Sequence, residues 1–282
     1  MRIVHTLRTL SLLTAIVYST LGTAQPNTPT WTLKGFDQPE SVVGDEQFLY
    51  VSNINGTPME ANGEGYISKI TSSGQWIKQR WAEGMDAPKG MAIHEGYLYV
   101  ADLSRLHKID LRNGKTVAQW HAPAAQMLND VTVSPEGIVY VSDLLAGGLY
   151  RLVDGEFSLW KSYAEIEHPN GVFWEDNQLI IGNWGQGLND DFSTHSPGTL
   201  YRLNLANETL TPFHDGTPLG NIDGITRIND TIWISDWLAG DLMKSDGSNK
   251  QHLGQGLADI GSVGNILYAP MMMDGTVNAW QP

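Results

Sequence analysis

Short apolar runs separated by polar turns recur along the chain, and residues 168–184 contain the clearest copy of the repeated unit. The unit opens with a turn around Asn170, continues through two apolar runs joined by a polar turn, and ends at Asn183 and Trp184. β-Branched and aromatic residues dominate the runs, as is typical of strands. Helical periodicity is not sustained over any useful length. The pattern therefore predicts an all-β protein built from hairpins.

The unit occurs six times along the chain. Aligning the copies places one residue of each in the position of Asn170, and we call these six the ring residues: Glu40, Lys89, Asn129, Asn170, Asp223 and Asp259. Successive ring residues lie 49, 40, 41, 53 and 36 residues apart. These spacings are of the size of one four-stranded propeller blade, which takes roughly 40 to 50 residues. The sequence therefore predicts a six-bladed β-propeller.

The two ends of the chain predict how the ring closes. Residues 31–36 form an additional strand before the first ring residue, whereas the last repeat stops after residues 277–280. We expect the N-terminal strand to complete the last blade, because joining the two ends in one sheet removes an exposed sheet edge. The propeller would then span residues 31–282, preceded by a short tail at 25–30.

Residues 1–24 have the features of a secretory signal. Arg2 and Arg8 precede an apolar run over residues 10–21, and small residues up to Ala24 provide a cleavage site. The apolar run is too short to cross a bilayer, which takes about 20 residues. The sequence contains no cysteine, so it forms no disulfide. We expect a periplasmic or secreted protein.

The charge balance bears on the partners. The formal net charge is -14 at pH 7, from 31 acidic and 17 basic residues. Binding to nucleic acid or to anionic membranes depends on Lys and Arg neutralising phosphates. We therefore expect neither a nucleic-acid partner nor stable insertion into a membrane, and a small molecule is the expected ligand.

Four ring residues carry side-chain oxygens that we expect to converge on the axis: Glu40, Asn129, Asn170 and Asp223. In antiparallel blades the innermost strands all begin on the same face of the ring. Two carboxylates and two carboxamides suit one divalent cation, with Ca²⁺ expected first and Mg²⁺, Mn²⁺ or Zn²⁺ as alternatives. In a second interpretation, Asn and Asp at these places only serve turn geometry. Lys89 could instead pair with a carboxylate, and Asp259 belongs to the least regular repeat.

These residues resemble the family of senescence marker protein (regucalcin), gluconolactonase and luciferin-regenerating-enzyme-like proteins, six-bladed propellers that hydrolyse lactones with a divalent cation. Glu40 after Pro39 is similar to the first metal ligand of that family. Asn170 and Asp223, each followed by glycine, are similar to its asparagine and aspartate ligands. The resemblance implies that these three residues bind the cation, and that Asn129 contacts water or substrate.

One departure from the family concerns the substrate. Its sugar-acid lactonases carry an arginine two residues before the equivalent of Asn129, where this chain has Met127, which argues against a sugar-acid lactone. Apolar residues follow the second strand in five repeats: Ile54, Leu103, Leu144, Trp184 and Trp237. They predict either an apolar mouth for an uncharged or aromatic substrate, or packing between blades. Trp184 and Trp237 are the expected substrate contacts, together with Met127 and Asn129.

Two long loops, 53–64 and 183–198, leave from the face on which the ring residues converge. The second could cover the channel as a lid or extend into solvent. Taken together, the residues predict an exported metal-dependent hydrolase of lactones or related esters, with Asp223 as the general base. The alternative is a non-catalytic exported propeller that serves as a scaffold for a ligand or a protein.

Overall fold

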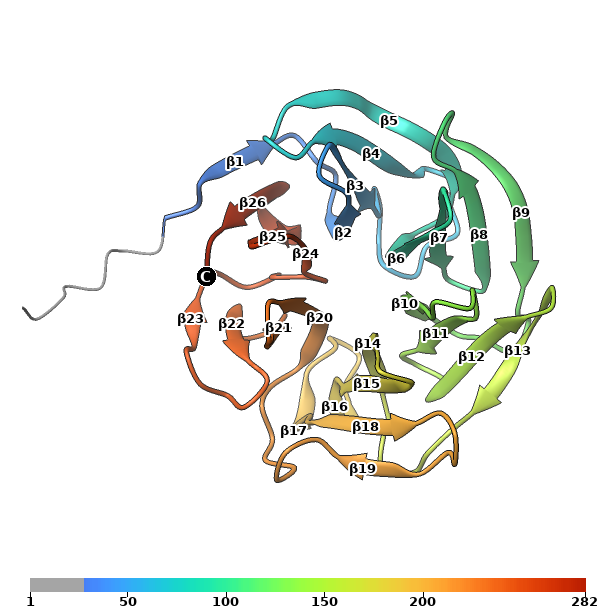
Figure 1. Ribbon diagram of the computed structural model, residues 1–282, viewed down its shortest axis with the longest axis vertical. Coiled ribbons are helices and arrows are strands. Elements are labelled where there is room, and N and C mark those ends of the chain that lie inside the picture. The colour runs from blue at the N-terminus through green and yellow to red at the C-terminus, as the bar shows by residue number, and fades with distance from the viewer. Residues whose placement is uncertain (1–27) are drawn as a thin grey trace, which may run out of the picture.

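The computed structural model describes residues 28–282, which form six four-stranded antiparallel sheets around a central axis (Figure 1). The predicted six-bladed β-propeller is confirmed. The predicted signal sequence, residues 1–24, and residues 25–27 of the predicted tail lie outside the described residues. No helix within 28–282 has the length and apolar character needed to cross a bilayer.

From the axis outward, blade one contains β2 (Pro39–Gly44), β3 (Phe48–Asn53), β4 (Gly65–Thr71) and β5 (Trp76–Met85), and blade two contains β6 (Pro88–His94), β7 (Tyr97–Asp102), β8 (Arg105–Asp110) and β9 (Lys115–His121). Blade three contains β10 (Leu128–Val133), β11 (Val139–Asp143), β12 (Gly148–Val153) and β13 (Glu156–Lys161). Blade four contains β14 (Pro169–Glu175), β15 (Gln178–Asn183), β18 (Leu200–Asn204) and β19 (Leu210–Pro212).

Blade five contains β20 (Ile222–Ile228), β21 (Thr231–Asp236), β22 (Asp241–Lys244) and β23 (Gln251–His252). Blade six contains β24 (Gly261–Val263), β25 (Ile266–Met271), β26 (Thr276–Trp280) and β1 (Trp31–Lys34). A two-stranded hairpin, β16 (Gly185–Leu188) and β17 (Thr194–Pro197), is inserted into blade four, and a 3₁₀ helix, η1 (Met272–Asp274), joins β25 to β26.

Tight turns join the first and second strands of the blades at the polar residues that the sequence marks. Glu95, Asp176 and Asn229 adopt left-handed backbone conformations, with φ of 46°, 47° and 52°. Asn and Asp tolerate this conformation better than other non-glycine residues, and glycine adopts it freely. The alternation of apolar run and polar turn is therefore the hairpin pattern of the blades.

The core is distributed between neighbouring blades. One cluster joins Tyr50 and Ile67 of blade one to Met91 and Val100 of blade two. Equivalent clusters fill the other spaces between blades. Each sheet packs on a neighbour with both faces, which explains why the second strands are apolar along their length rather than alternating.

The N-terminal strand closes the ring. β1 pairs with β26, from Trp31 opposite Ala279 to Lys34 opposite Thr276. The indole Nε1 of Trp31 also donates a hydrogen bond to the carbonyl oxygen of Ser72, 3.2 Å away in blade one. The predicted closure of the last blade by the N-terminal strand is confirmed, and the hydrogen bond of Trp31 connects the last blade to the first.

Candidate metal centre

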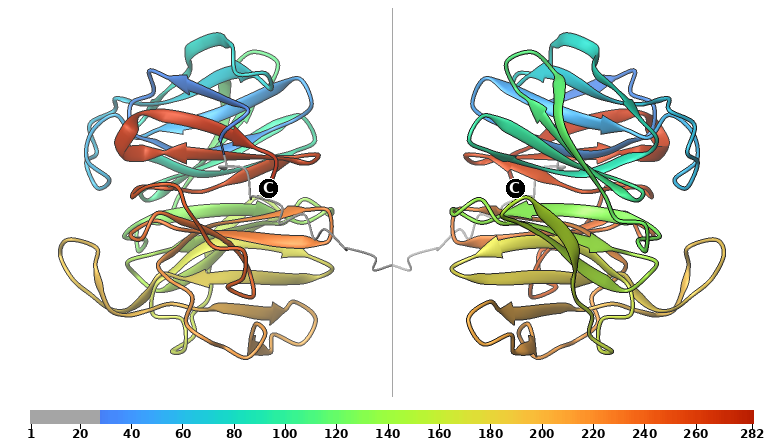
Figure 2. Two further views of the ribbon diagram at one scale, coloured as in Figure 1. Left: turned by 90° about the vertical axis from the view of Figure 1, so that its left-hand side faces the viewer. Right: turned by 90° about the vertical axis from the view of Figure 1, so that its right-hand side faces the viewer.

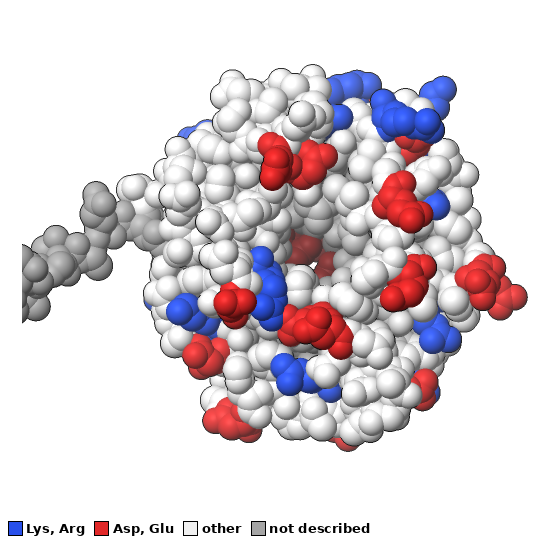
Figure 3. Space-filling model, viewed as in Figure 1, with Lys and Arg blue, Asp and Glu red and all other residues white. Residues whose placement is uncertain are grey.

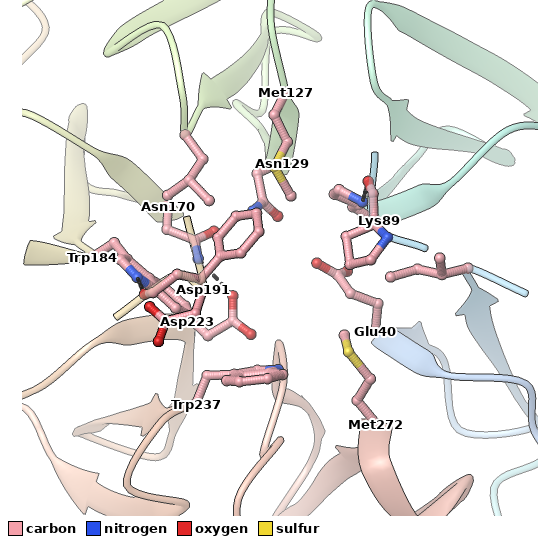
Figure 4. A pocket seen from close by; sticks show the side chains of 14 residues that line it. Glu40, Lys89, Met127, Asn129, Asn170, Trp184, Asp191, Asp223, Trp237 and Met272 are labelled. Carbon is pink, nitrogen blue, oxygen red and sulfur yellow. Dashed lines mark hydrogen bonds between the residues drawn. The ribbon is translucent and has the colours of Figure 1, made fainter. Parts of the chain in front are cut away.

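Five of the six ring residues lie at β-bulges where the innermost strands begin. In blade one the pairing of β2 with β3 shifts between Pro39 and Val42, so that Glu40 and Ser41 together oppose Ser52. The same shift occurs in β6, β10, β14 and β20. A bulge re-aims side chains relative to the regular ladder. The cavity at this end of the channel is lined by Glu40, Lys89, Asn129, Asn170 and Asp223 (Figure 4).

A serine of the second strand holds the bulge in three blades. Each serine Oγ accepts a hydrogen bond from the backbone N–H that follows the ring residue: Ser52 from Ser41 at 2.9 Å, Ser142 from Asp130 at 2.9 Å, and Ser235 from Gly224 at 2.8 Å. These bonds are buried, where an unpaired N–H would be costly. The serines of the repeated second strand therefore position the ring residues, a role that the repeat pattern alone does not reveal.

The polar residues that end the second strands fix the turn before each ring residue. Asp102 Oδ1 accepts from the Ala87 N–H at 2.8 Å, and Asp143 Oδ1 accepts from the Met127 N–H at 2.9 Å. Asn53 and Asn183 make similar bonds. None of these four side chains lines the cavity described above. They hold the backbone in place.

The cavity encloses about 510 Å³, part of it open to solvent. Glu40 and Lys89 lie on one wall, and Asn170 and Asp223 face them from the other side (Figure 4). Asn170 Nδ2 donates to Asp223 Oδ1 at 2.7 Å, so the carboxamide oxygen of Asn170 takes no part in this hydrogen bond. Acidic side chains are visible deep in the central channel along the ring axis (Figure 3).

Two oxygens of the predicted ligand set are buried without a hydrogen-bond donor. They are Glu40 Oε2 and Asn170 Oδ1, which come from blades one and four. Burying an acceptor without a partner costs about 1 to 3 kcal/mol. A cation between these oxygens would satisfy both, so the residues present fit a hard divalent ion.

The acidic groups of the cavity favour protonation in the protein alone. Burial raises the pKa of Asp223 to about 7. Burial also raises the pKa of Glu40 well above its usual range, and the negative charge of Asp223 adds to this effect. A bound cation reverses both effects because it stabilises the ionised carboxylates. Within residues 28–282 no three His, Cys, Asp or Glu side chains are grouped to hold a metal, so a site here depends on amide oxygens.

Apolar side chains form the remaining walls. Met127, Trp184 and Trp237 line the cavity as expected, with ring centroids of the two tryptophans 6.2 Å apart. Ile54 and Leu144 line it as well. The fifth apolar residue of this set, Leu103, does not line the cavity but packs against the buried cluster that contains Ile54. Residues of this set thus contribute both to the cavity wall and to buried apolar clusters.

Four further residues line the cavity without having been predicted as substrate contacts: Pro58, Asp191, Phe192 and Met272. Asp191 and Phe192 belong to the segment that joins β16 to β17, and the indole of Trp184 donates to the Phe192 carbonyl oxygen at 2.9 Å. The loop with Pro58 and the β16–β17 hairpin project from the same side of the ring (Figure 2). The segment between β16 and β17, which lies in the 183–198 loop, therefore contributes to the cavity wall.

The two ring residues outside the predicted set of four make different contacts. Asp259 does not line this cavity; its Oδ2 accepts from Ser41 Oγ at 2.5 Å, and it lines a second cavity together with Asp130. Lys89, for which pairing with a carboxylate was one alternative, forms no ion pair within residues 28–282. Its Nζ donates to two backbone carbonyl oxygens, those of Pro58 at 2.9 Å and Ala87 at 3.3 Å.

The comparisons with known proteins show the fold. No family model matches the chain, and no curated protein matches its sequence. The structure of virginiamycin B lyase from Staphylococcus aureus is similar with a TM-score of 0.63 at 14% identity, over 89% of this chain and 98% of that one. A luciferin-regenerating enzyme is similar with a TM-score of 0.60 at 14% identity, over 89% and 93%. At this level of identity both likenesses show the fold alone, which agrees with the architecture that the sequence predicts.

Proposed function

We propose that this protein is an exported hydrolase of lactones or related esters that depends on one divalent cation, with Ca²⁺ as the expected ion. The observation that carries the proposal is the pair of unpartnered buried oxygens, Glu40 Oε2 and Asn170 Oδ1, in a cavity that Asp223 also lines. These three side chains would hold the cation. Support for a propeller enzyme also comes from the two neighbours, which by their names are a lyase and a regenerating enzyme.

The roles proposed for the chain's own residues follow from their positions. A divalent cation, when bound, supplies Lewis acidity at the acyl carbonyl. Asp223 accepts a proton from the attacking water as the water oxygen adds to the carbonyl carbon. The bond from that carbon to the ring or ester oxygen then breaks, and the departing oxygen takes up the proton. Asn129 orients the water or the acyl group, while Met127, Trp184 and Trp237 exclude bulk solvent.

The cellular location and partners remain part of the proposal. The signal-like residues 1–24 support a periplasmic or secreted location. A net charge of -14 argues against nucleic acid as a partner. The mostly apolar wall supports a small uncharged or aromatic lactone or ester as the substrate.

The test is hydrolysis of simple aryl esters and apolar lactones by wild-type protein, chelator-treated protein and Asp223→Ala. We expect chelation to abolish turnover and added Ca²⁺ to restore it. Asp223→Ala should lower kcat by about 10² to 10⁴-fold, because it removes both the general base and a ligand. Equal turnover in all three samples would overturn the proposal.

Two further measurements distinguish hydrolysis from elimination and from a non-catalytic binding role. Hydrolysis in heavy-oxygen water should place one labelled oxygen in the acid product, whereas elimination would leave the product unlabelled. Tight Ca²⁺ binding without turnover of any ester or lactone would instead support the non-catalytic scaffold.

A further inference from the structure

Lys89 is a buried cation whose charge has no assigned role. It is 1% exposed and is the second residue of the innermost strand of blade two. Two of its three ammonium protons are directed to the carbonyl oxygens of Pro58 and Ala87. Lys89 forms no ion pair with any residue between 28 and 282, in contrast to Lys161 and Lys250. One donor is therefore left without a protein acceptor.

The surroundings of Lys89 favour an anion-binding role over a purely structural one. The hydrogen bond to the Pro58 carbonyl oxygen holds the loop of residues 54–64 in place. A neutral donor could make the same hydrogen bond, so this bond does not require the charge of Lys89. A buried ammonium is costly unless it is compensated. Burial lowers the pKa of Lys89, and the carboxylates of Glu40, Asp102 and Asp223 oppose this effect. Glu40 lies beside Lys89 on the same wall of the cavity (Figure 4). The charge is thus kept at the cavity wall and faces the space between the two walls.

We propose that Lys89 is the anion-binding group of this cavity, which donates to the acyl oxygen that becomes negative during hydrolysis and to the carboxylate of the product. The inference rests on the proposed function and adds a ligand class to it. Among the described residues that line the cavity, Lys89 alone is basic. With Trp184 and Trp237 on the walls, the product is a small carboxylic acid with an apolar or aromatic body.

The test compares the binding of 3-phenylpropionate with that of its neutral amide by isothermal titration calorimetry, in the presence of Ca²⁺ and again after chelation. We expect wild-type protein with Ca²⁺ to bind the carboxylate at least about tenfold more tightly than the amide, a difference of about 1.4 kcal/mol. Lys89→Met should lose most of this preference. Lys115→Met, which removes an exposed charge from β9, should keep it.

The outcomes distinguish the roles of Lys89. Lys89→Met should unfold in a single cooperative transition at a lower melting temperature, because the carbonyl oxygens of Pro58 and Ala87 lose their donor. In kinetic assays it should lower kcat by about 10² to 10³-fold with little change in KM for a neutral ester. A carboxylate preference that survives Lys89→Met but is lost on chelation would overturn the proposal and assign anion binding to the metal. A preference that depends on Lys89 without any turnover would sustain anion binding and reject the hydrolase instead.

Discussion

At the scale of single residues, the cavity gathers groups that are unfavourable to one another in the protein alone. Glu40 and Asp223 are buried carboxylates whose pKa values are raised, and Asn170 carries a buried oxygen without a donor. Local arrangements that break the rules of stability occur mainly at functional sites. A cation would turn each of these unfavourable features into a favourable one.

This arrangement predicts an unusual dependence of stability on pH. Because the pKa of Asp223 is raised to about 7 in the folded protein, its proton is lost less readily there than in the unfolded chain, where the value is about 3.9. In chelator-treated protein, the contribution of this group to the free energy of unfolding should be complete below about pH 4 and decline as pH rises through about 7. Urea unfolding at a series of pH values measures the decline.

The control for this prediction is Asp223→Asn, which keeps an oxygen that can accept from Asn170 and removes the titration. Its stability after chelation should fall less between about pH 5 and about pH 8 than that of the wild type. Ca²⁺ should stabilise the wild type more at the higher pH, where the carboxylates are ionised, and should have little effect on Asp223→Asn. Identical pH profiles for the two proteins would contradict the role given to Asp223.

At the scale of elements, the bulge links the repeated sequence to the site. The second-strand serine and the ring residue lie in different strands, so their relation becomes visible only when the strands are paired. Ser235 Oγ accepts from the Gly224 N–H and donates to the Ala258 carbonyl oxygen at 2.9 Å, which joins blade five to the connection leading into blade six. The position of Asp223 therefore depends on a residue twelve positions later in the chain.

Ser235→Ala should disturb this arrangement. Loss of the hydroxyl leaves the Gly224 N–H and the Ala258 carbonyl without their buried partner, at a cost of about 1 to 3 kcal/mol in the free energy of unfolding. The bulge that carries Asp223 should also loosen, so the affinity for Ca²⁺ should fall. Chemical unfolding and calorimetry measure the two effects. Ser73→Ala, on an exposed turn, is the matched control, and equal behaviour of the two variants would reject the positioning role of Ser235.

The blades and five of the six ring positions could be predicted because both follow from local pattern. Strand length, turn chemistry and the repeat period are properties of consecutive residues. The place of Asp259 could not be predicted, because Asp259 pairs with Ser41 across the closure of the ring. The contribution of Phe192 to the cavity could not be predicted either. The hydrogen bond from the Trp184 indole to its carbonyl oxygen depends on how a long hairpin folds back. Neither contact leaves a periodic signal in the sequence.

At the scale of the whole molecule, ring closure holds the site together. The cavity takes residues from several blades, so its geometry requires all of them to keep their places around the axis. β1 pairs with the outer edge of β26, and Trp31 packs against Tyr268 with ring centroids 5.8 Å apart. The first strand of the described chain thus stabilises a site to which it contributes no side chain.

Removing this strand should open the ring. A chain that begins at Gly35 lacks β1 and exposes the edge of β26, which invites intermolecular pairing. We expect its melting temperature to fall by roughly 5 °C or more, with increased light scattering on heating. A chain that begins at Thr30 retains β1 and should behave as the longer protein does. Equal melting temperatures for the two truncations would show that closure by β1 is dispensable.

The central claim, that oxygens from separate blades bind one divalent cation in this cavity, is tested most directly by diffraction from crystals grown with Mn²⁺ as the probe ion. The anomalous difference map should contain one strong peak in contact with side-chain oxygens of Glu40, Asn170 and Asp223, at about 2.0 to 2.6 Å. A map with no peak in the cavity, at an Mn²⁺ concentration that fills other sites on the protein, would contradict the account.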